Sequence, residues 1–303
     1  MTDPGEPLVK IVDRLAARLG PVSGEPEPLD GGITNRNYRV RFGDRDCVLR
    51  LPGRDTGLLG IDRAAERVAT ERAAALGIAP RLLAADADCM VTEWLPGAPM
   101  DGDRLRADPS SAARALRTFH DSGLELPVRF WIPDLLEDYA RIISQRGAGL
   151  PDSYRRTQRL VARIADALPL TDPAPCHDDL LPGNILATRA DPGRAMLVDW
   201  EYAGMGHRYF DLGNLAVNND FNEDAQDRLL RAYFDAPPTA GRRAALHLMM
   251  LVSDAREAAW GVVQGSISEL DFDFGDYAAQ HFGRLDRNAS DPRLEDWLRA
   301  AAA

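Results

Sequence analysis

The chain has 303 residues, of which 45% are hydrophobic and 27% are charged, an ordinary globular composition that leaves room for two lobes or one large domain. Its formal net charge of −11 argues against a nucleic-acid partner, which needs a basic surface, and no apolar run is long enough to insert into a membrane. The acidic start lacks the basic segment of a signal peptide, and three cysteines without metal-ligand spacing favour a reducing compartment, so we expect a cytoplasmic protein.

The first part of the chain predicts a helix followed by strands. Apolar residues recur at helical spacing over 8–19, and Gly20 and Pro21 end that helix. Strands are expected at 38–42 and 47–51, after a glycine-bearing turn. Glycine lets backbone amides approach phosphate groups without a Cβ in the way, although such hairpins are also common without a ligand. The candidate phosphate contacts in this turn are Gly31, Gly32, Thr34 and Asn35.

Arg50 is the candidate phosphate-binding cation of the strand at 47–51. Strand alternation places Val48 and Arg50 on one face. Lys10 is the only lysine and lies upstream of the glycine turn, so it cannot take this position. Arginine is always charged and can bind phosphate oxygens through two N–H groups. The plain alternative is an exposed strand arginine.

An alanine-rich helix is expected at 61–76, and a carboxylate on it should pair with Arg50. Glu66 and Glu71 are both available, and periodicity does not choose between them. Two strands follow, at 81–85 and 90–94, and the chain beyond residue 99 is mostly helical. We therefore expect a small lobe at 1–95 with a sheet and one helix, and a larger helical lobe at 96–303.

The stretch 175–184 carries the strongest chemical signal. Two short apolar runs, 184–187 and 195–198, flank a turn-rich segment and predict a hairpin. That hairpin would bring Asp179, Asn184 and Asp199 together. Such a set suits phosphoryl transfer: Asp179 would receive the proton of an attacking hydroxyl, and Asn184 and Asp199 would hold Mg²⁺ on ATP. The plain alternative is a surface loop with turn-forming Asp and Asn.

The pattern His-x-Asp-x-x-x-x-Asn, followed by an Asp that ends an apolar strand, resembles the protein-kinase-like small-molecule kinases, which include the aminoglycoside phosphotransferases and the choline/ethanolamine kinases. The segments Gly-Gly-Ile-Thr-Asn, Val-Leu-Arg, Asp-Trp-Glu-Tyr and Trp followed by Gln occur in the order of the choline/ethanolamine kinase family. The resemblance extends from Gly31 to about Tyr277. It implies an α+β, two-lobed protein-kinase-like fold, with a small antiparallel sheet and a mainly helical second lobe.

The resemblance also implies roles for residues that spacing alone does not assign. It favours Glu66 as the partner of Arg50, and it places the backbone of Glu93 and Leu95 at a hinge against adenine. His177 would orient the catalytic loop without accepting the proton, and Asp211 would tie the backbone of that loop together. Asp178 is expected to be a solvated bystander.

The segment 254–264 is the candidate acceptor site. On a helix, Asp254, Glu257 and Trp260 share a face, and an aromatic ring with nearby carboxylates suits a trimethylammonium group through a cation–π attraction of about 1–2 kcal/mol. Tyr202 is a second aromatic candidate, and Glu201 beside it is a further candidate contact. Equally, Trp260 could be a core aromatic whose neighbouring acids face solvent. Eukaryotic choline kinases carry two tryptophans here, and Glu257 stands in place of the earlier one, which shifts the expectation toward ethanolamine or a different amino alcohol.

We therefore expect an enzyme that transfers the γ-phosphoryl group of ATP, with Mg²⁺, to choline or a related amino alcohol. One alternative is an aminoglycoside or other metabolite phosphotransferase of the same fold. A second is a nucleotide-binding pseudokinase without turnover, for which the missing lysine is the only support. The oligomeric state stays open.

Overall fold

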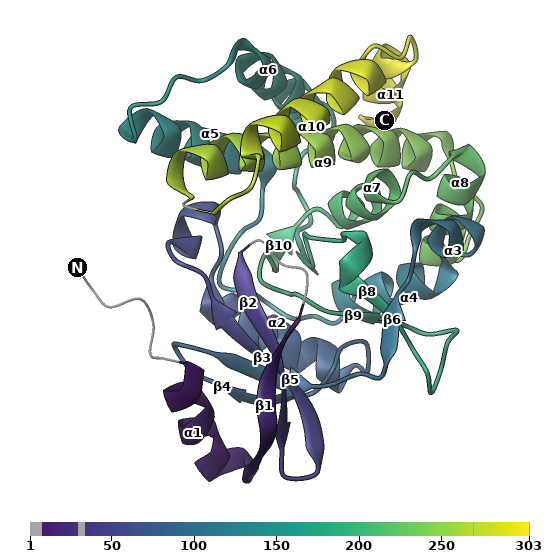
Figure 1. The fold of residues 1–303 in the computed structure, drawn as a ribbon. Coiled ribbons are helices and arrows are strands. Elements are labelled where there is room, and N and C mark those ends of the chain that lie inside the picture. Colours follow the sequence, from purple (N-terminus) through teal and green to yellow (C-terminus); the bar gives the residue numbers. More distant parts are fainter. Residues whose placement is uncertain (1–7, 30–33, 269, 303) are drawn as a thin grey trace.

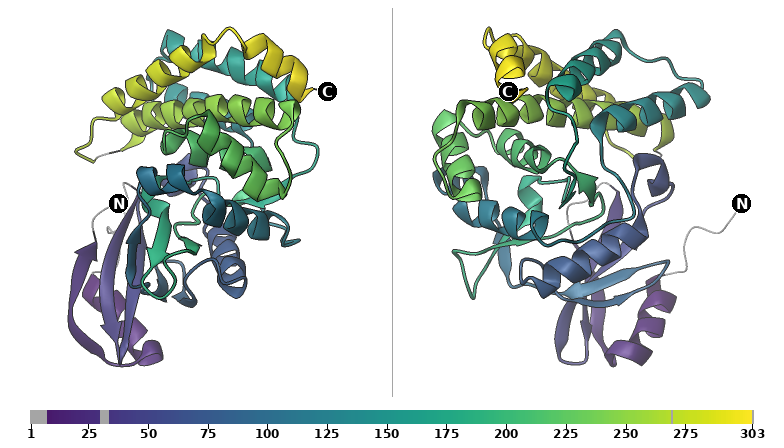
Figure 2. Two further views of the ribbon diagram at one scale, coloured as in Figure 1. Left: turned by 90° about the vertical axis from the view of Figure 1, so that its right-hand side faces the viewer. Right: turned by 180° about the vertical axis from the view of Figure 1, so that it is seen from behind.

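The computed structural model of the chain describes residues 8–29, 34–268 and 270–302. In Figure 1 a β-sheet with two helices occupies the lower part of the molecule, and a larger group of helices occupies the upper part. Both views in Figure 2 keep the sheet at one end and the long helices at the other. The expected α+β architecture, with an antiparallel sheet in the N-terminal region and a helical C-terminal region, is confirmed.

The N-terminal sheet has five strands in the order β1-β2-β3-β5-β4, and every neighbouring pair is antiparallel. The sequence pattern does not predict β1, because Gly24, Pro26 and Pro28 are unfavourable within strands. Proline is tolerated there because β1 lies at the edge of the sheet, where a missing N–H breaks no inner ladder. The strands are β1 (Val22–Leu29), β2 (Asn35–Phe42), β3 (Arg45–Pro52), β4 (Leu82–Ala85) and β5 (Met90–Glu93).

Two helices accompany this sheet. Helix α1 (Leu8–Leu19) buries Ile11, Val12 and Leu15 in a cluster with apolar residues of β2 and β3. Helix α2 (Arg63–Ala75) begins two residues later than expected. The side chain of Asp62 caps it by accepting hydrogen bonds from the backbone amides of Ala64 and Ala65. A short 3₁₀ helix, η1 (Thr56–Leu59), precedes α2.

The C-terminal region is organised around helix α9 (Ala240–Ile267), which is buried along most of its length. Helices α7, α10 and α11 pack against α9, and Figure 1 shows α9 running behind α10 across the top of the molecule. Helices α5, α6 and α8 also contact α9, and α4 packs against α8 and α7. The bounds of the helices in this region are α3 (Gly102–Ala107), α4 (Ser110–His120), α5 (Ile132–Gln145), α6 (Asp152–Ala167), α7 (Arg208–Asn218), α8 (Glu223–Phe234), α10 (Phe274–Ala289) and α11 (Leu294–Ala301).

Two small sheets support the loops between the two regions. The expected hairpin is formed by β8 (Ile185–Thr188) and β9 (Ala195–Leu197), and β6 (Gly97–Pro99) adds to β8. Strand β7 (Ala174–Cys176) pairs with β10 (Gly204–Gly206). Because β5 belongs to the large sheet while β6 pairs with β8, we propose that the lobe boundary lies near residue 95, with lobes at 1–95 and 96–303. None of the described helices is both long and apolar enough to cross a membrane.

Candidate active site

A cavity of about 570 Å³ lies between the large sheet and the loops that follow β7 and β9. It is lined from the sheet side by β3 and β5 and from the helical side by α9 and by the loop 177–184, the expected catalytic loop. Most of the expected site residues border this cavity or touch a residue that does. Those that border it are Thr34, Arg50, Glu93, Leu95, Asp179, Asn184, Asp199, Glu201, Tyr202, Glu257 and Trp260.

Gly31 and Gly32 lie outside the described residues, so the glycine turn stays a prediction. Asn35 and Glu66 reach the site through their contacts with Glu201 and Arg50. His177 belongs to the loop that carries Asp179, and Asp211 on α7 bonds the backbone of that loop.

The backbone of the catalytic loop is held by Asp211 on α7. Its two carboxylate oxygens accept hydrogen bonds from the backbone amides of His177 and Asp178, each at 2.8 Å, and its Oδ2 also lies 2.8 Å from His120 Nε2. Burial works to raise the pKa of Asp211, but these partners outweigh it and lower the pKa below its ordinary value. The carboxylate is therefore ionised where it supports the loop, and these contacts fit the structural role expected of it.

His177 connects the loop to the end of β9. Its Nε2 lies 2.9 Å from the carbonyl oxygen of Val198, and its ring packs on Trp200 with centroids 4.5 Å apart. Burial lowers the pKa of His177, so the imidazole is neutral near pH 7. Its Nδ1 accepts a hydrogen bond from the amide of Asp179 at 3.3 Å, a contact that orients the loop.

Asp178 is fully buried, so the expectation of a solvated bystander is wrong. Its backbone is in the left-handed region at φ 65°, and this turns its side chain inward toward Gly206. Within the described structure neither carboxylate oxygen has a hydrogen-bond partner, and burial raises the pKa well above its ordinary value. A Cβ on Gly206 would lie 3.2 Å from Asp178 Oδ1, so any larger residue at 206 would crowd this carboxylate.

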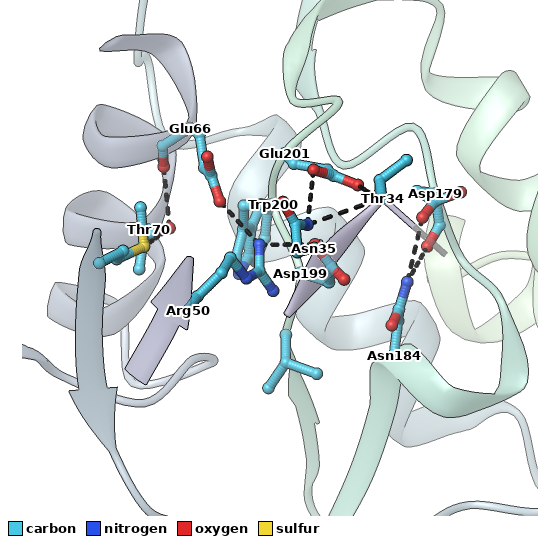
Figure 3. A network of polar contacts seen from close by, with 12 residues as sticks. Thr34, Asn35, Arg50, Glu66, Thr70, Asp179, Asn184, Asp199, Trp200 and Glu201 are labelled. Atoms are coloured by element: carbon cyan, nitrogen blue, oxygen red, sulfur yellow. Dashed lines mark hydrogen bonds and ion pairs between the residues drawn. The ribbon is translucent and has the colours of Figure 1, made fainter. Parts of the chain in front are cut away.

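Asp179, Asn184 and Asp199 all border the cavity, and Figure 3 shows Asn184 bonded to Asp179 while Asp199 lies beside Arg50. The Asn184 side-chain amide donates hydrogen bonds to the carbonyl oxygen of Asp179 at 2.8 Å and to its Oδ2 at 3.2 Å. The amide of Val198 donates to the carbonyl oxygen of Asn184 at 3.0 Å, which anchors Asn184 to the strand leading to Asp199. Burial raises the pKa of Asp179, and Arg256 opposes that rise.

Arg50 is held by carboxylates from both regions of the molecule (Figure 3). Its Nη1 lies 2.7 Å from Glu66 Oε1 and 2.7 Å from Asp199 Oδ1. Glu66 is buried, whereas Glu71 is exposed, so the geometry selects Glu66 from the two candidates. Val48 and Arg50 both line the cavity, as the strand alternation predicts.

Arg63, the first residue of α2, is a site residue that the sequence pattern does not single out. Its Nη1 donates to Glu66 Oε2 at 2.7 Å and to Glu201 Oε2 at 3.2 Å, and its Nη2 donates to Asn35 Oδ1 at 3.1 Å. The only sequence signal is its spacing of three from Glu66 at the start of a helix. Arg63 thereby joins the helix, the strand β2 and the segment after β9.

Glu201 is bonded to Thr34 and Asn35, at the start of β2. Thr34 Oγ1 donates to its Oε1 at 2.5 Å, and Asn35 Nδ2 donates to its Oε2 at 2.8 Å. Burial raises the pKa of Glu201 above its ordinary value. These bonds tie Glu201 to the sheet rather than to the candidate acceptor residues. Contact between Glu201 and the acceptor stays a prediction.

The candidate acceptor residues Tyr202, Glu257 and Trp260 form one group with two further residues, Arg256 and Tyr277. Trp260 Nε1 donates to Tyr202 Oη at 2.9 Å, and Tyr277 Oη donates to Glu257 Oε2 at 2.6 Å. Arg256 Nη1 lies 2.8 Å from Glu257 Oε1. An arginine beside acids reads as a surface pair in the sequence, so its position here is a finding of the tertiary structure.

Asp254 lies apart from this group. Arg284 on α10 donates to its Oδ1 at 2.5 Å, and His281 Nδ1 lies 3.3 Å from the same oxygen. Asp254 is fully buried and is not among the described residues that line the cavity. The helix spacing places it on the correct side of α9, but packing of α10 turns it into an ion pair between two helices.

Two sets of side chains have the chemistry of metal ligands. Asn184 and Asp199 border the cavity and offer an amide and a carboxylate, the oxygen ligands that Mg²⁺ prefers, so they fit that ion. His120, Cys176 and Asp211 lie within 4.8 Å of one another beneath the loop, but His120 also bonds Tyr233 Oη through Nδ1, and both Asp211 oxygens are engaged. The second set is therefore structural.

Residues 25–247 match the phosphotransferase enzyme family. A solved choline/ethanolamine kinase family protein from Mesorhizobium loti is similar to the chain at 30% identity, covering 96% of this chain and 98% of that protein, with a TM-score of 0.80. Choline kinase LicA from Streptococcus pneumoniae is similar at 25% identity, covering 93% and 98%, with a TM-score of 0.78. A complex of LicA with AMP is 24% identical and has a TM-score of 0.74 over 95% and 98% of the two chains. Human choline/ethanolamine kinase is 25% identical over 319 residues, which cover 88% of this chain and 80% of that protein.

Proposed function

Because the chain belongs to the choline/ethanolamine kinase family, within the wider phosphotransferase enzyme family, we propose that it transfers the γ-phosphoryl group of ATP to choline or a related amino alcohol such as ethanolamine. Its place in the family makes it a phosphotransferase with an alcohol group as acceptor. The observation that carries the proposal is the meeting of Asp179, Asn184, Asp199 and Arg50 at one cavity.

On the donor side, Arg50 would bind phosphate oxygens of the nucleotide and Glu66 would hold Arg50 in place. Thr34 and Asn35, with Gly31 and Gly32, would cover the phosphates from the glycine turn. Glu93 and Leu95 border the same cavity, and their backbone groups would meet the adenine base. Asn184 and Asp199 would hold Mg²⁺, which when bound neutralises charge on the phosphate groups.

On the acceptor side, Asp179 would accept the proton of the attacking hydroxyl as its oxygen bonds to the γ-phosphorus and the bond to ADP breaks. Burial raises the pKa of Asp179, and a raised pKa makes the carboxylate a stronger proton acceptor once it is ionised. Tyr202, Glu257 and Trp260 would bind the amino group of the acceptor. Orientation of the two substrates would supply much of the acceleration.

The three cysteines support the cytoplasm as the compartment, because all three are buried free thiols. A reducing environment keeps such thiols from forming disulfides.

The partners that we propose for the cavity are small molecules: ATP and a small cationic acceptor.

ADP release tests the proposal with ATP, Mg²⁺ and a panel of choline, ethanolamine, aminoglycosides and sugars. We expect turnover with an amino alcohol, and we expect Asp179→Asn to lower kcat by about 10²–10⁴-fold while ATP binding, measured by calorimetry, is kept. Asp172→Asn is the matched control, because this carboxylate is exposed. Turnover confined to aminoglycosides would favour the antibiotic-kinase alternative, and ATP binding without turnover of any acceptor would favour a pseudokinase.

A further inference from the structure

Arg256 on α9 lies inside the candidate acceptor site. Its side chain is only 2% exposed, yet it is among the residues that border the cavity. Its Nη1 lies 3.3 Å from Asp179 Oδ1 and 2.8 Å from Glu257 Oε1. One nitrogen atom of the protein therefore bridges the proposed proton acceptor and the carboxylate expected to bind the acceptor's amino group.

The flat face of the same guanidinium covers an aromatic ring. Arg256 Cζ lies 4.2 Å from the ring centroid of Tyr202, within the range of a cation–π contact. Trp260 donates to the hydroxyl of that tyrosine, and Tyr277 donates to the second oxygen of Glu257. The aromatic ring and the carboxylate that would receive a quaternary ammonium are thus already in contact with a cation of the chain itself.

We infer that Arg256 is an internal cation that fills the quaternary-ammonium position and makes the site select acceptors with a primary ammonium group over choline. This inference rests on the proposed function and names the subclass of amino alcohol that the site takes. Arg256 acts here as a specificity-determining residue.

The discrimination follows from the chemistry of the two ammonium groups. A trimethylammonium group has no N–H donor, so its binding relies on open aromatic faces and on a diffuse negative field. Arg256 occupies the face of Tyr202 and neutralises part of that field. A primary ammonium has three donors and can share Glu257, because a carboxylate offers about four acceptor positions and two of them are used here.

The charge of the group still accommodates a small cation. Asp179 and Glu257 carry two formal negative charges in their ionised forms, and Arg256 supplies one positive charge. Arg256 Nε and Nη2 have no hydrogen-bond partner among the described residues, so Asp179, Glu257 and Tyr202 are the contacts that hold the guanidinium. Removal of the side chain would leave two carboxylates and an uncovered ring, which together are the features that bind a quaternary ammonium.

Calorimetric binding of tetramethylammonium tests the inference without requiring turnover. We expect Arg256→Ala to bind tetramethylammonium at least tenfold more tightly than the unmodified protein does. We also expect the ratio of kcat/KM for choline to that for ethanolamine to rise at least tenfold, since a ratio is insensitive to a general loss of activity. Arg242→Ala is the matched control, because Arg242 lies on the same helix, over Phe234 at 4.0 Å, and does not border the cavity.

Arg256→Met serves as a second variant that fills more of the vacated volume, should circular dichroism show that the alanine variant does not fold. Tetramethylammonium binding that is equal in the unmodified protein and the folded Arg256 variant would overturn the inference, as would an unchanged choline-to-ethanolamine ratio. If the unmodified protein phosphorylates no amino alcohol, the proposed function fails, and the tetramethylammonium measurement still decides whether Arg256 fills the cation position.

Discussion

The two walls of the cavity each place an arginine between carboxylates, but they use it differently. Arg50 on the sheet wall lies between Glu66 and Asp199, and its side chain is 15% exposed at the cavity. Arg256 on the helical wall lies between Asp179 and Glu257, and its side chain is 2% exposed and stacked on Tyr202. The accessible arginine can meet a ligand's phosphate groups, whereas the covered arginine takes the position of a ligand's own cation.

This difference shows that two arginines in similar ion pairs can act differently: one is open to a ligand, and the other is covered by the protein. Burial works against the charged form of Arg50, but the surrounding acids outweigh it and raise its pKa, so the guanidinium stays charged. The same balance of burial against acids raises the pKa of Arg256. Charge state therefore does not distinguish the two walls, and the access of a ligand to each guanidinium does.

On the sheet wall, the largest change in KM should follow from substitution of Glu66, the carboxylate that holds Arg50. We expect Glu66→Gln to raise the KM for ATP about 10- to 100-fold, because breaking a buried charged pair costs a few kcal/mol. The KM for the amino alcohol should change little, since Glu66 contacts Arg50 and Arg63 on the sheet wall. Steady-state kinetics with each substrate varied in turn measure both values.

Glu71→Gln on the same helix is the control for this prediction, because its side chain is exposed. Equal effects of the two substitutions on the KM for ATP would show that Arg50 is not positioned by Glu66.

On the helical wall we expect a smaller effect, which raises the KM for the acceptor and leaves the KM for ATP unchanged. Tyr277→Phe removes the hydroxyl that donates to Glu257 at 2.6 Å, so Glu257 is less firmly held for the acceptor's ammonium. We expect the KM for ethanolamine to rise about 3- to 10-fold, consistent with the loss of a hydrogen bond to a charged group, and the KM for ATP to stay the same.

Tyr154→Phe is the matched control for Tyr277→Phe, since it removes a buried hydroxyl that donates to the carbonyl oxygen of Leu136 at 2.7 Å, away from the cavity. A rise in the KM for ATP after Tyr277→Phe would contradict the separation of the two walls.

The smallest change in kcat is expected after substitution of the buried Asp178. Burial raises the pKa of this carboxyl in the folded state, so between its ordinary value and the raised value the folded protein keeps a proton that the unfolded chain releases. Stability is therefore lost as the pH rises through that window, by up to about 1.4 kcal/mol per pH unit. Asp178→Asn cannot lose a proton, and asparagine tolerates the left-handed backbone at this position.

Thermal unfolding at pH 5 and pH 8 checks this expectation. The midpoint of Asp178→Asn, relative to that of the unmodified protein, should be higher at pH 8 than at pH 5, with kcat nearly unchanged. A constant difference between the two midpoints at both pH values would show that Asp178 has no raised pKa.

Much of the sheet wall, and of the hairpin on the opposite side of the cavity, could be predicted from the sequence because their chemistry lies in short segments. The hairpin that joins Asn184 to Asp199 is local, and strand alternation predicts that Arg50 shares a face with Val48, the face that borders the cavity. The family pattern favours Glu66 over Glu71, and the ion pair with Arg50 agrees with it. The sequence pattern does not predict the edge strand β1, because its prolines oppose a strand and are tolerated only at the edge of the sheet.

The helical wall could be predicted only in part, because its contacts join helices that are far apart in the sequence. Helical spacing brings Asp254, Glu257 and Trp260 to similar sides of α9. Packing of α10 then pairs Asp254 with Arg284 and bonds Glu257 to Tyr277. Asp178 looks like a loop residue in the sequence, and its left-handed backbone together with Gly206 allows it to be buried.

The sequence by itself indicated the family, the α+β architecture and the candidate set of Asp179, Asn184 and Asp199, because local periodicity and short motifs encode them. The tertiary structure decided which cation occupies which wall. Helix packing closes Arg256 over Tyr202 and between two carboxylates, and no local pattern along the chain specifies that arrangement.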